Sequence, residues 1–423
     1  MSKRRIAVIG GGPIGLEAAL EGARRGFEVV VYEDGRVGEH LRRFGHVGLF
    51  TPFGMNSTPA SRARLVAEGT TLPSEDALLT ASELVDRYLA PLAALPELRP
   101  ALHERTRVTH VGREGIPKTR GIVAVGDETR AKRSFLLRVA TAGGAMRLER
   151  ANIVLDASGV YGTPNGTGPG GLPALGEESL GDRADRWIPS LLGADRERYR
   201  GRRVLLIGDG HSAATALLEL DALAAERGGG PAHVDWVRRD RGPGAPFVEV
   251  PDDPLPARRA LASRASAIAR SAAWLERHPG ATVEEYVTGP KGVRITLREA
   301  SRGSRTVEVD RVLALTGYRP DLELCRELQI HLCYASEAPM KLASAILTAS
   351  LSSPAGAGDC LKQTSHGAET LQNPEPDVYV LGAKSYGRNP LFLLTIGYQQ
   401  IQDVFTLIGS PEASRTAAPS LVS

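Results

Sequence analysis

The sequence contains little cysteine, few aromatic residues and no long hydrophobic run. Its three cysteines, Cys325, Cys333 and Cys360, form neither a CxxC pair nor a metal-ligand spacing. We therefore predict no metal site, no disulfide framework and no CxxC dithiol. No stretch approaches the roughly 20 apolar residues that a membrane span requires. Because Lys3-Arg4-Arg5 leads directly into a strand-like run, we expect a cytoplasmic protein without a membrane partner.

A large excess of one charge is also missing. The chain has 52 Lys and Arg residues against 49 Asp and Glu residues, which gives no reason to expect a nucleic-acid partner. Glycine, in contrast, is plentiful with 47 of 423 residues, and hydrophobic residues make up 42%. The chain is long enough for two or three domains, and its composition is typical of an α/β protein with many tight turns.

A glycine-rich turn follows a short apolar run at residues 5–9, which is typical of a parallel strand buried on both faces. Residues 16–25 then favour a helix. The first glycine would form the tight turn, the second would let the backbone approach a diphosphate, and the third would let the helix pack against the strand. The predicted diphosphate-binding residues are Gly10, Gly12, Pro13, Ile14 and Gly15.

The residues after this helix indicate which nucleotide would bind. Residues 27–32 favour a second strand, which is followed by Glu33. A carboxylate at this place accepts hydrogen bonds from the ribose hydroxyls and repels a 2′-phosphate. We expect FAD or NAD here; the alternative is a glycine-rich turn without a ligand.

A second glycine turn follows another strand-like run at residues 203–207. Its predicted nucleotide-binding residues are Gly208, Gly210, His211, Ser212 and Ala213. The next strand, residues 233–237, is followed by Arg238 and Arg239, whose guanidinium groups would pair with a 2′-phosphate. We therefore expect NADPH; the alternative is a solvated strand end. His211 is expected to cap the helix or contact the nucleotide, with catalysis as the alternative.

The order of these motifs predicts one dinucleotide-binding domain inserted into another. Residues 151–159 and 310–321 are similar strand-and-turn segments that would each close one unit. The predicted fold is α/β, with two Rossmann-like three-layer (ββα) domains. The predicted boundaries are 1–165 and 310–410 for the first domain, 166–309 for the second and 411–423 for a flexible tail. Residues 239–257 are a candidate lid or substrate loop.

The two turns, with the DASG segment at residues 156–159 and LTGYRPD at 315–321, resemble the flavoproteins with two dinucleotide-binding domains. This superfamily includes thioredoxin reductases and flavin-containing monooxygenases. The resemblance implies FAD in the first domain, NADPH in the inserted one, and hydride transfer between them. It also implies that Ser158, Gly159 and Gly382 contact FAD.

The monooxygenase side of this superfamily fits better, because the redox cysteine pair of the reductases is absent. Residues 45–62 resemble the monooxygenase segment whose asparagine lies near the flavin, and Asn56 is the match. Its amide would hydrogen-bond a C4a-hydroperoxyflavin. The full FxGxxxHxxxW/Y signature is missing, and Ala383 replaces the acid that usually contacts the ribityl chain. Lys384 or Ser385 would then make a different contact, and the KSYGR run resembles a bacterial monooxygenase-like branch.

The predicted catalytic residues are Asn56, Lys384 and Tyr386, with Arg388, Cys360 and His366 as further residues near the flavin. The alternatives are a turn residue for Asn56, ion pairing within the fold for Lys384 and Arg388, and a small buried hydrophobe for Cys360. We expect a monooxygenase that uses O2 for N-, S- or Baeyer–Villiger oxidation of a small molecule, and a homodimer is compatible with the sequence. A reductase of a thiol, quinone or protein partner and a nucleotide-binding redox sensor remain alternatives.

Overall fold

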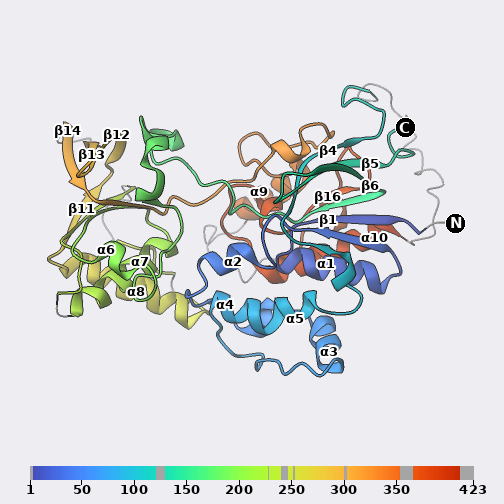
Figure 1. Ribbon diagram of the computed structural model, residues 1–423, viewed down its shortest axis with the longest axis horizontal. Helices are drawn as coiled ribbons and strands as arrows, with labels where there is room; N and C mark the ends of the chain where they lie inside the picture. The colour runs from blue at the N-terminus through green and yellow to red at the C-terminus, as the bar shows by residue number, and fades with distance from the viewer. Residues whose placement is uncertain are drawn as a thin grey trace. The chain divides into compact units, whose positions relative to one another are not determined.

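The computed structural model describes residues 3–120, 129–226, 228–239, 246–250, 253–299, 303–352 and 365–409. The chain forms two compact units (Figure 1). The first comprises residues 1–42, 51–163 and the chain from Arg319 onward, and the second comprises residues 43–50 and 164–318. The second crossing lies later than the predicted residue 310, because the strand at Arg311–Ala314 pairs within the second unit. The predicted tail at 411–423 lies outside the described residues.

The first unit is built on a five-stranded parallel sheet in the order β16-β7-β1-β2-β3. Every pairing in the sheet is parallel, and β1 carries an almost continuously buried run because both faces are covered. The strands are β1 (Arg5–Ile9), β2 (Glu28–Tyr32), β3 (Leu102–His103), β7 (Ile153–Asp156) and β16 (Val378–Val380).

Helices and a second sheet complete this unit as three layers. On one side, α1 (Pro13–Arg24) packs with α10 (Leu394–Ile408) (Figure 1). On the other side lies an antiparallel sheet of β4 (Thr106–Arg113), β5 (Phe135–Thr141) and β6 (Met146–Ala151). Side chains of both sheets share one hydrophobic cluster. This is the predicted ββα arrangement.

This unit also contains further helical elements. They are α2 (Glu39–Arg43), η1 (Phe53–Asn56), α3 (Pro59–Ala67), α4 (Ala81–Leu84), η2 (Val85–Leu89), α5 (Ala90–Ala93), η3 (Arg99–Ala101), η6 (Glu323–Cys325), α9 (Met340–Ser352), η8 (Ala368–Leu371) and η9 (Gly382–Tyr386). The last of these, η9, begins two residues after β16 ends, so it lies at the carboxyl end of that strand.

The second unit repeats the plan. Its parallel sheet has the order β11-β10-β9-β15-β8, with a three-stranded antiparallel sheet and the helices completing the layers. Its strands are β8 (Ala184–Asp185), β9 (Arg203–Ile207), β10 (His233–Arg238), β11 (Leu275–Pro279), β12 (Thr282–Gly289), β13 (Gly292–Glu299), β14 (Gly303–Val309) and β15 (Arg311–Ala314). Its helices are η4 (Pro169–Gly171), η5 (Glu177–Arg183), α6 (Arg196–Tyr199), α7 (His211–Ala225) and α8 (Pro256–Ser271).

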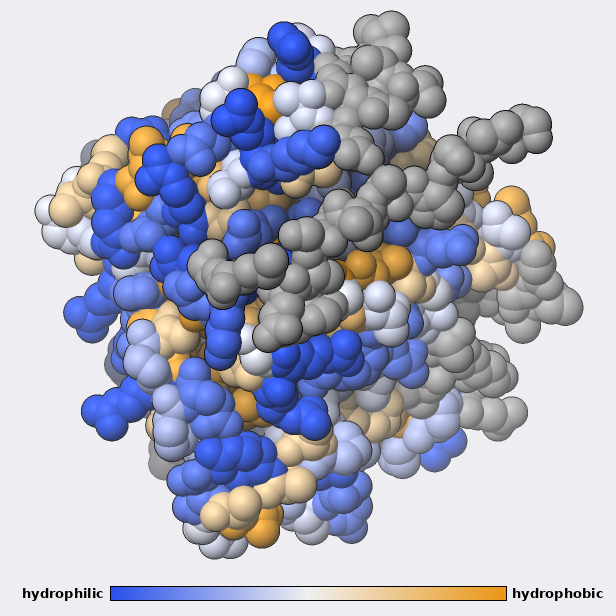
Figure 2. Space-filling view, turned by 90° about the vertical axis from the view of Figure 1, so that its right-hand side faces the viewer, coloured by the Kyte–Doolittle hydropathy of each residue, from blue (hydrophilic) through white to orange (hydrophobic). Residues whose placement is uncertain are grey.

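No helix in the described ranges has the length and apolar character needed to cross a bilayer. In the coloured part of Figure 2, hydrophilic side chains predominate, with hydrophobic ones scattered between them.

Candidate functional site

The first glycine turn joins β1 to α1 and is shaped by backbone crowding. Gly10 has φ of +109°, and a Cβ there would lie 2.5 Å from the carbonyl oxygen of Ala157. A Cβ on Gly15 would overlap the carbonyl oxygen of Gly10, whereas a Cβ on Gly12 would meet nothing within 4 Å. Helix α1 has no side-chain cap and carries Pro13 at its start. The turn therefore presents an open backbone surface and a helix N-terminus, which together suit a diphosphate.

Glu33 lies across this turn, directly after β2. Its Oε2 accepts a hydrogen bond from the Gly11 N–H (2.6 Å), and its Oε1 accepts one from the Gly35 N–H (2.8 Å). Burial raises the pKa of Glu33, and these two hydrogen bonds oppose the rise. Because each carboxylate oxygen has a second lone pair, Glu33 still has capacity to accept hydrogen bonds from ribose hydroxyls.

The C-terminal turn lies against the first one. A Cβ on Gly382 would come within 3.2 Å of the Ile14 side chain. Gln400 of α10 fixes the turn, because its Oε1 accepts from the Gly382 N–H (2.9 Å) and its Nε2 donates to Ser385 (2.9 Å). Two turns far apart in the sequence thus form one continuous surface at the carboxyl ends of β1 and β16. Gly159 lies at the same edge of the sheet, three residues after the carboxyl end of β7.

Lys384 is part of a buried ion pair. Its Nζ lies 2.7 Å from Asp156 Oδ2 and donates to Ser158 Oγ over 3.1 Å. The Ser158 hydroxyl in turn donates to Asp156 Oδ1 (2.6 Å). Burial disfavours the ammonium, yet the adjacent Asp156 carboxylate raises the pKa of Lys384 above its ordinary value. This geometry matches the alternative of ion pairing within the fold, since the ammonium remains charged and bonded.

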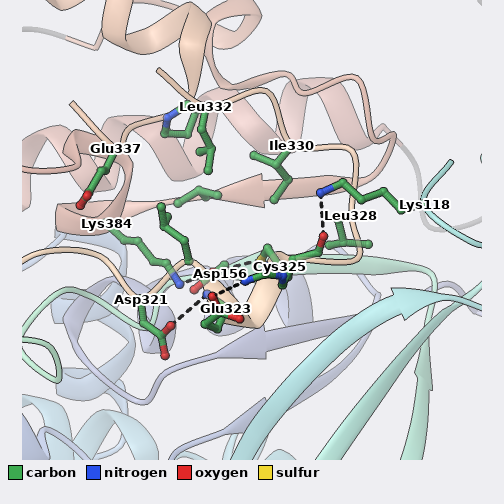
Figure 3. A pocket seen from close by; sticks show the side chains of 14 residues that line it. Lys118, Asp156, Asp321, Glu323, Cys325, Leu328, Ile330, Leu332, Glu337 and Lys384 are labelled. Atoms are coloured by element: carbon green, nitrogen blue, oxygen red, sulfur yellow. Dashed lines mark hydrogen bonds and ion pairs between the residues drawn. The ribbon is translucent and has the colours of Figure 1, made fainter. Parts of the chain in front are cut away.

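A cavity of about 300 Å³ opens beside this ion pair (Figure 3). Asp156, Cys325 and Lys384 line one side, and Ile330 and Leu332 face them. Cys325 Sγ lies 3.6 Å from Asp156 Oδ2, and burial raises the pKa of the thiol, so the thiol stays protonated. The sequence did not predict this cavity, because its lining comes from segments far apart in the chain: Lys118, β7, residues 321–339, β16 and η9.

The other predicted catalytic residues have local roles. Asn56 is buried in η1 and its amide closes on Thr51, accepting from the hydroxyl and donating to the carbonyl oxygen (2.8 Å each). The Tyr386 hydroxyl is buried without a hydrogen-bond partner in the part of the chain that is described, and burial raises its pKa to about 12. Asn56 thus matches its alternative interpretation as a turn residue, while the Tyr386 hydroxyl has no acceptor for its proton within the described residues.

The remaining residues predicted near the flavin also differ from one another. Arg388 pairs with Glu337 (2.7 Å), which is the ion pairing weighed as its alternative. His366 is half-buried, and burial lowers the pKa of its imidazole. Cys360 lies outside the described residues.

The second glycine turn joins β9 to α7. Gly208 has φ of +130° and is crowded by the carbonyl oxygen of Leu315, whereas a Cβ on Gly210 would meet nothing within 4 Å. His211 and Ser212 begin α7, which has no side-chain cap, and Ala213 is fully buried. The His211 ring lies edge-on to Phe50 at 5.3 Å, and partial desolvation of the exposed ring, together with the nearby Arg258 charge, lowers its pKa. A neutral His211 at a helix N-terminus is compatible with contact to a nucleotide.

The two arginines after β10 differ in what they contact. Arg239 pairs with Asp209, with Nη2 2.7 Å from Oδ1 and Nε 3.2 Å from Oδ2. Asp209 occupies the second position of the glycine turn and was not predicted as a site residue. The Arg238 guanidinium lies 5.7 Å from the Trp236 ring, and its Nε is buried without an acceptor in the described part of the chain. Arg238 therefore has an unused donor beside the turn, and Arg239 does not depend on a ligand for its partner.

No family model matches the sequence, and no curated protein matches it. Solved structures match nearly the whole chain. The bacillithiol disulfide reductase of Bacillus cereus is 17% identical with a TM-score of 0.69, covering 96% of this chain and 99% of that one. The ornithine N-hydroxylase of Kutzneria sp. 744 is 15% identical (TM-score 0.62; 96% and 99% covered). The flavin-containing monooxygenase of Stenotrophomonas maltophilia is 22% identical (TM-score 0.54; 97% and 100% covered).

These similar structures include both disulfide reductases and monooxygenases, and all of them cover both units. They show the α/β fold class. The chain has the fold of the flavoproteins with two dinucleotide-binding domains.

Proposed function

We propose that the protein is an oxidoreductase that binds FAD in the first unit and NADPH in the second. One observation carries this proposal: two open glycine cradles are followed by side chains of opposite charge. Glu33 follows the first cradle, and Arg238 and Arg239 follow the second. A carboxylate accepts hydrogen bonds from ribose hydroxyls, whereas guanidinium groups attract a 2′-phosphate.

The residues fit both groups. In the first unit, Gly12 and the N-terminus of α1 would hold the FAD diphosphate, and Glu33 would bind its ribose. In the second unit, Gly210 and the N-terminus of α7 would hold the NADPH diphosphate, and the Arg238 guanidinium would pair with the 2′-phosphate. When bound, FAD accepts a hydride from the nicotinamide and passes electrons to an acceptor. The protein's own residues would bind FAD and NADPH, orient them for hydride transfer and shield them from water.

We further propose that the acceptor is O2 and that a small organic molecule is oxygenated. The support is the state of the two cysteines in the described part of the chain. Cys325 and Cys333 are free thiols, and the raised pKa of Cys325 makes it a poor nucleophile. The buried Tyr386 hydroxyl would supply a hydrogen-bond donor without giving up its proton.

A disulfide or quinone reductase is the second candidate. It is favoured by Cys325, which lies in the cavity beside the Lys384–Asp156 pair. It is also favoured by the similarity to the bacillithiol disulfide reductase. In that case the cavity would admit the acceptor, and Cys325 would need to become reactive during turnover.

Anaerobic reduction followed by mixing with different acceptors separates the candidates. The purified protein should be yellow, and NADPH should bleach it under nitrogen faster than NADH does. A monooxygenase then reoxidises with O2 while releasing less H2O2 than the NADPH consumed once a substrate is present. Fast reoxidation by disulfides or quinones, unaffected by O2, would favour the reductase. A colourless protein that still binds NADPH would contradict both.

A further inference from the structure

A cluster of two histidines and three carboxylates lies in the second unit, away from the glycine turn. His233 and Asp235 alternate on β10, and Glu276 and His278 alternate on β11. Side chains two residues apart point to the same face of a strand. Because β10 and β11 run parallel with Asp235 paired to Glu276, the strand register brings the four side chains together at the sheet edge.

The spacing of three of these side chains suits a bound cation. His233 Nε2 lies 3.6 Å from Asp235 Oδ1 and 3.6 Å from Glu276 Oε2. All three ligand atoms lie within 4.8 Å of one another. Both separations from His233 are too long for hydrogen bonds. They are close to the spacing of about 3.3 Å between ligands that each bind one tetrahedral ion at about 2.0–2.1 Å.

Further side chains hold the carboxylates in place. His278 Nε2 contacts Asp235 Oδ1 (2.8 Å), and His278 Nδ1 contacts Glu299 (2.9 Å). Arg305 binds both oxygens of Glu276 (2.5 and 3.0 Å). Each carboxylate oxygen retains a second lone pair, so these contacts leave room for a metal bond. Such outer hydrogen bonds orient the ligands of metal sites.

The three proposed ligands differ in their exposure to solvent, which a metal site needs if the ion is to enter from solution. The Asp235 side chain is 6% exposed, whereas His233 and Glu276 are 38% and 39% exposed. An ion can therefore enter from solvent and reach a fixed inner ligand. The cluster carries three carboxylates against the positive charges of Arg305 and of His278, whose pKa is raised, despite burial, by its contacts to two of these carboxylates. Negative charge therefore still exceeds positive charge and would favour a cation.

We propose that His233, Asp235 and Glu276 bind a divalent transition-metal ion, with zinc favoured and water completing its coordination. One imidazole and two carboxylates are a nitrogen and oxygen donor set that zinc accepts and that magnesium and calcium sites rarely use. Because two ligands lie on β10 and one lies on the edge strand β11, the ion would fasten the edge of the sheet. This site is independent of the proposed oxidoreductase activity.

Titration with Co2+ tests the site, using full-length protein that has been treated with chelator and freed of any affinity tag. We expect one equivalent to bind, with visible absorption bands of a coordinated ion, and Zn2+ to displace it. His233→Asn and Glu276→Gln should each weaken binding by at least about 10- to 100-fold, because losing only an outer group that orients a ligand already costs that much. His110→Asn, which changes an exposed histidine on β4, should bind as the unmodified protein does.

Two results would overturn the proposal. One is the absence of stoichiometric Co2+ or Zn2+ binding by folded protein, as judged by circular dichroism. The other is unchanged affinity in both His233→Asn and Glu276→Gln. A rise in melting temperature on adding Zn2+ that is lost in His233→Asn, but kept in His110→Asn, would support the structural role of the ion.

Discussion

Lys384 was predicted as a catalytic residue, yet its ammonium is bonded inward to Asp156 and Ser158. Replacing it by methionine would leave the Asp156 carboxylate buried without its cation. We expect Lys384→Met to lower the free energy of unfolding by about 3–5 kcal/mol, as measured by urea denaturation. The double variant Lys384→Met with Asp156→Asn should recover part of this loss. Full stability combined with abolished turnover would instead indicate a catalytic role.

We predict that replacing Arg238 and replacing Arg239 will affect the choice between NADPH and NADH differently. Arg238 has an unused donor, so Arg238→Ala should weaken NADPH binding by about 1.5–3 kcal/mol, the value of a charge-assisted hydrogen bond, and leave NADH nearly unchanged. Arg239→Ala would remove one cation that pairs with the Asp209 carboxylate in the turn, which increases the negative charge facing any diphosphate and should weaken both coenzymes. The measurement is KM for each coenzyme in flavin reduction. Equal losses for NADPH and NADH in Arg238→Ala would contradict the assignment.

Asp209→Asn provides the matched control for the second effect. It removes the negative charge from the turn while keeping the side-chain size. Combined with Arg239→Ala, it should restore NADH binding toward that of the unmodified protein. If the double variant binds no better than Arg239→Ala alone, repulsion by Asp209 is not the cause of the loss.

At the scale of elements, helix α1 carries a buried acid, Glu17, two residues after Gly15. Glu17 accepts hydrogen bonds from Tyr88, from Ser61 (2.5 Å) and from Thr58 (3.0 Å), so α1 is joined to η2 and to the start of α3. Burial raises the pKa of Glu17, and these hydrogen bonds oppose the rise. The native state therefore holds this proton more tightly than the unfolded chain does.

The consequence is a defined pH dependence of stability. The contribution of Glu17 is fully present below its unfolded pKa of about 4.5 and is lost as pH rises through the higher native value. Glu17→Gln stays neutral and should flatten this part of the curve of unfolding free energy against pH. Glu17→Ala should cost about 1–3 kcal/mol for each hydroxyl left unpaired. An identical slope in Glu17→Gln and the unmodified protein would show that Glu17 does not titrate in this range.

At the scale of the whole molecule, local patterns predicted the two turns, their flanking strands and the three-layer plan. Those features depend on residues close in sequence, such as Gly10 beside Gly15. The pairs that decide the chemistry join distant residues: Lys384 with Asp156, Arg239 with Asp209 and Glu17 with Tyr88. Only the folded sheets bring them together. The later crossing at residues 318–319 also depends on pairing, because β15 joins the sheet of β9.

Because the two glycine turns lie in separate units, we predict that a substitution in one turn weakens binding of its own coenzyme and leaves binding of the other unchanged. Gly12 and Gly210 have φ of −87° and −95°, which alanine tolerates, and a Cβ at either meets nothing within 4 Å. Each methyl group would instead project where a diphosphate approaches. We expect Gly12→Ala to fold normally and lose FAD at least about tenfold while keeping NADPH affinity, and Gly210→Ala to show the reverse. Visible absorbance measures bound FAD, and calorimetry measures NADPH binding.

Gly15→Ala distinguishes steric exclusion of the coenzyme from general damage. A Cβ at Gly15 overlaps the carbonyl oxygen of Gly10, so this variant should lower the melting temperature as well as FAD binding. The alanine at position 12 should lower FAD binding alone. If Gly12→Ala retains its full FAD content, the diphosphate does not lie over this turn, and the assignment of the first unit would be wrong. Loss of both coenzymes in either alanine variant would show that the two sites are coupled rather than built independently on separate sheets.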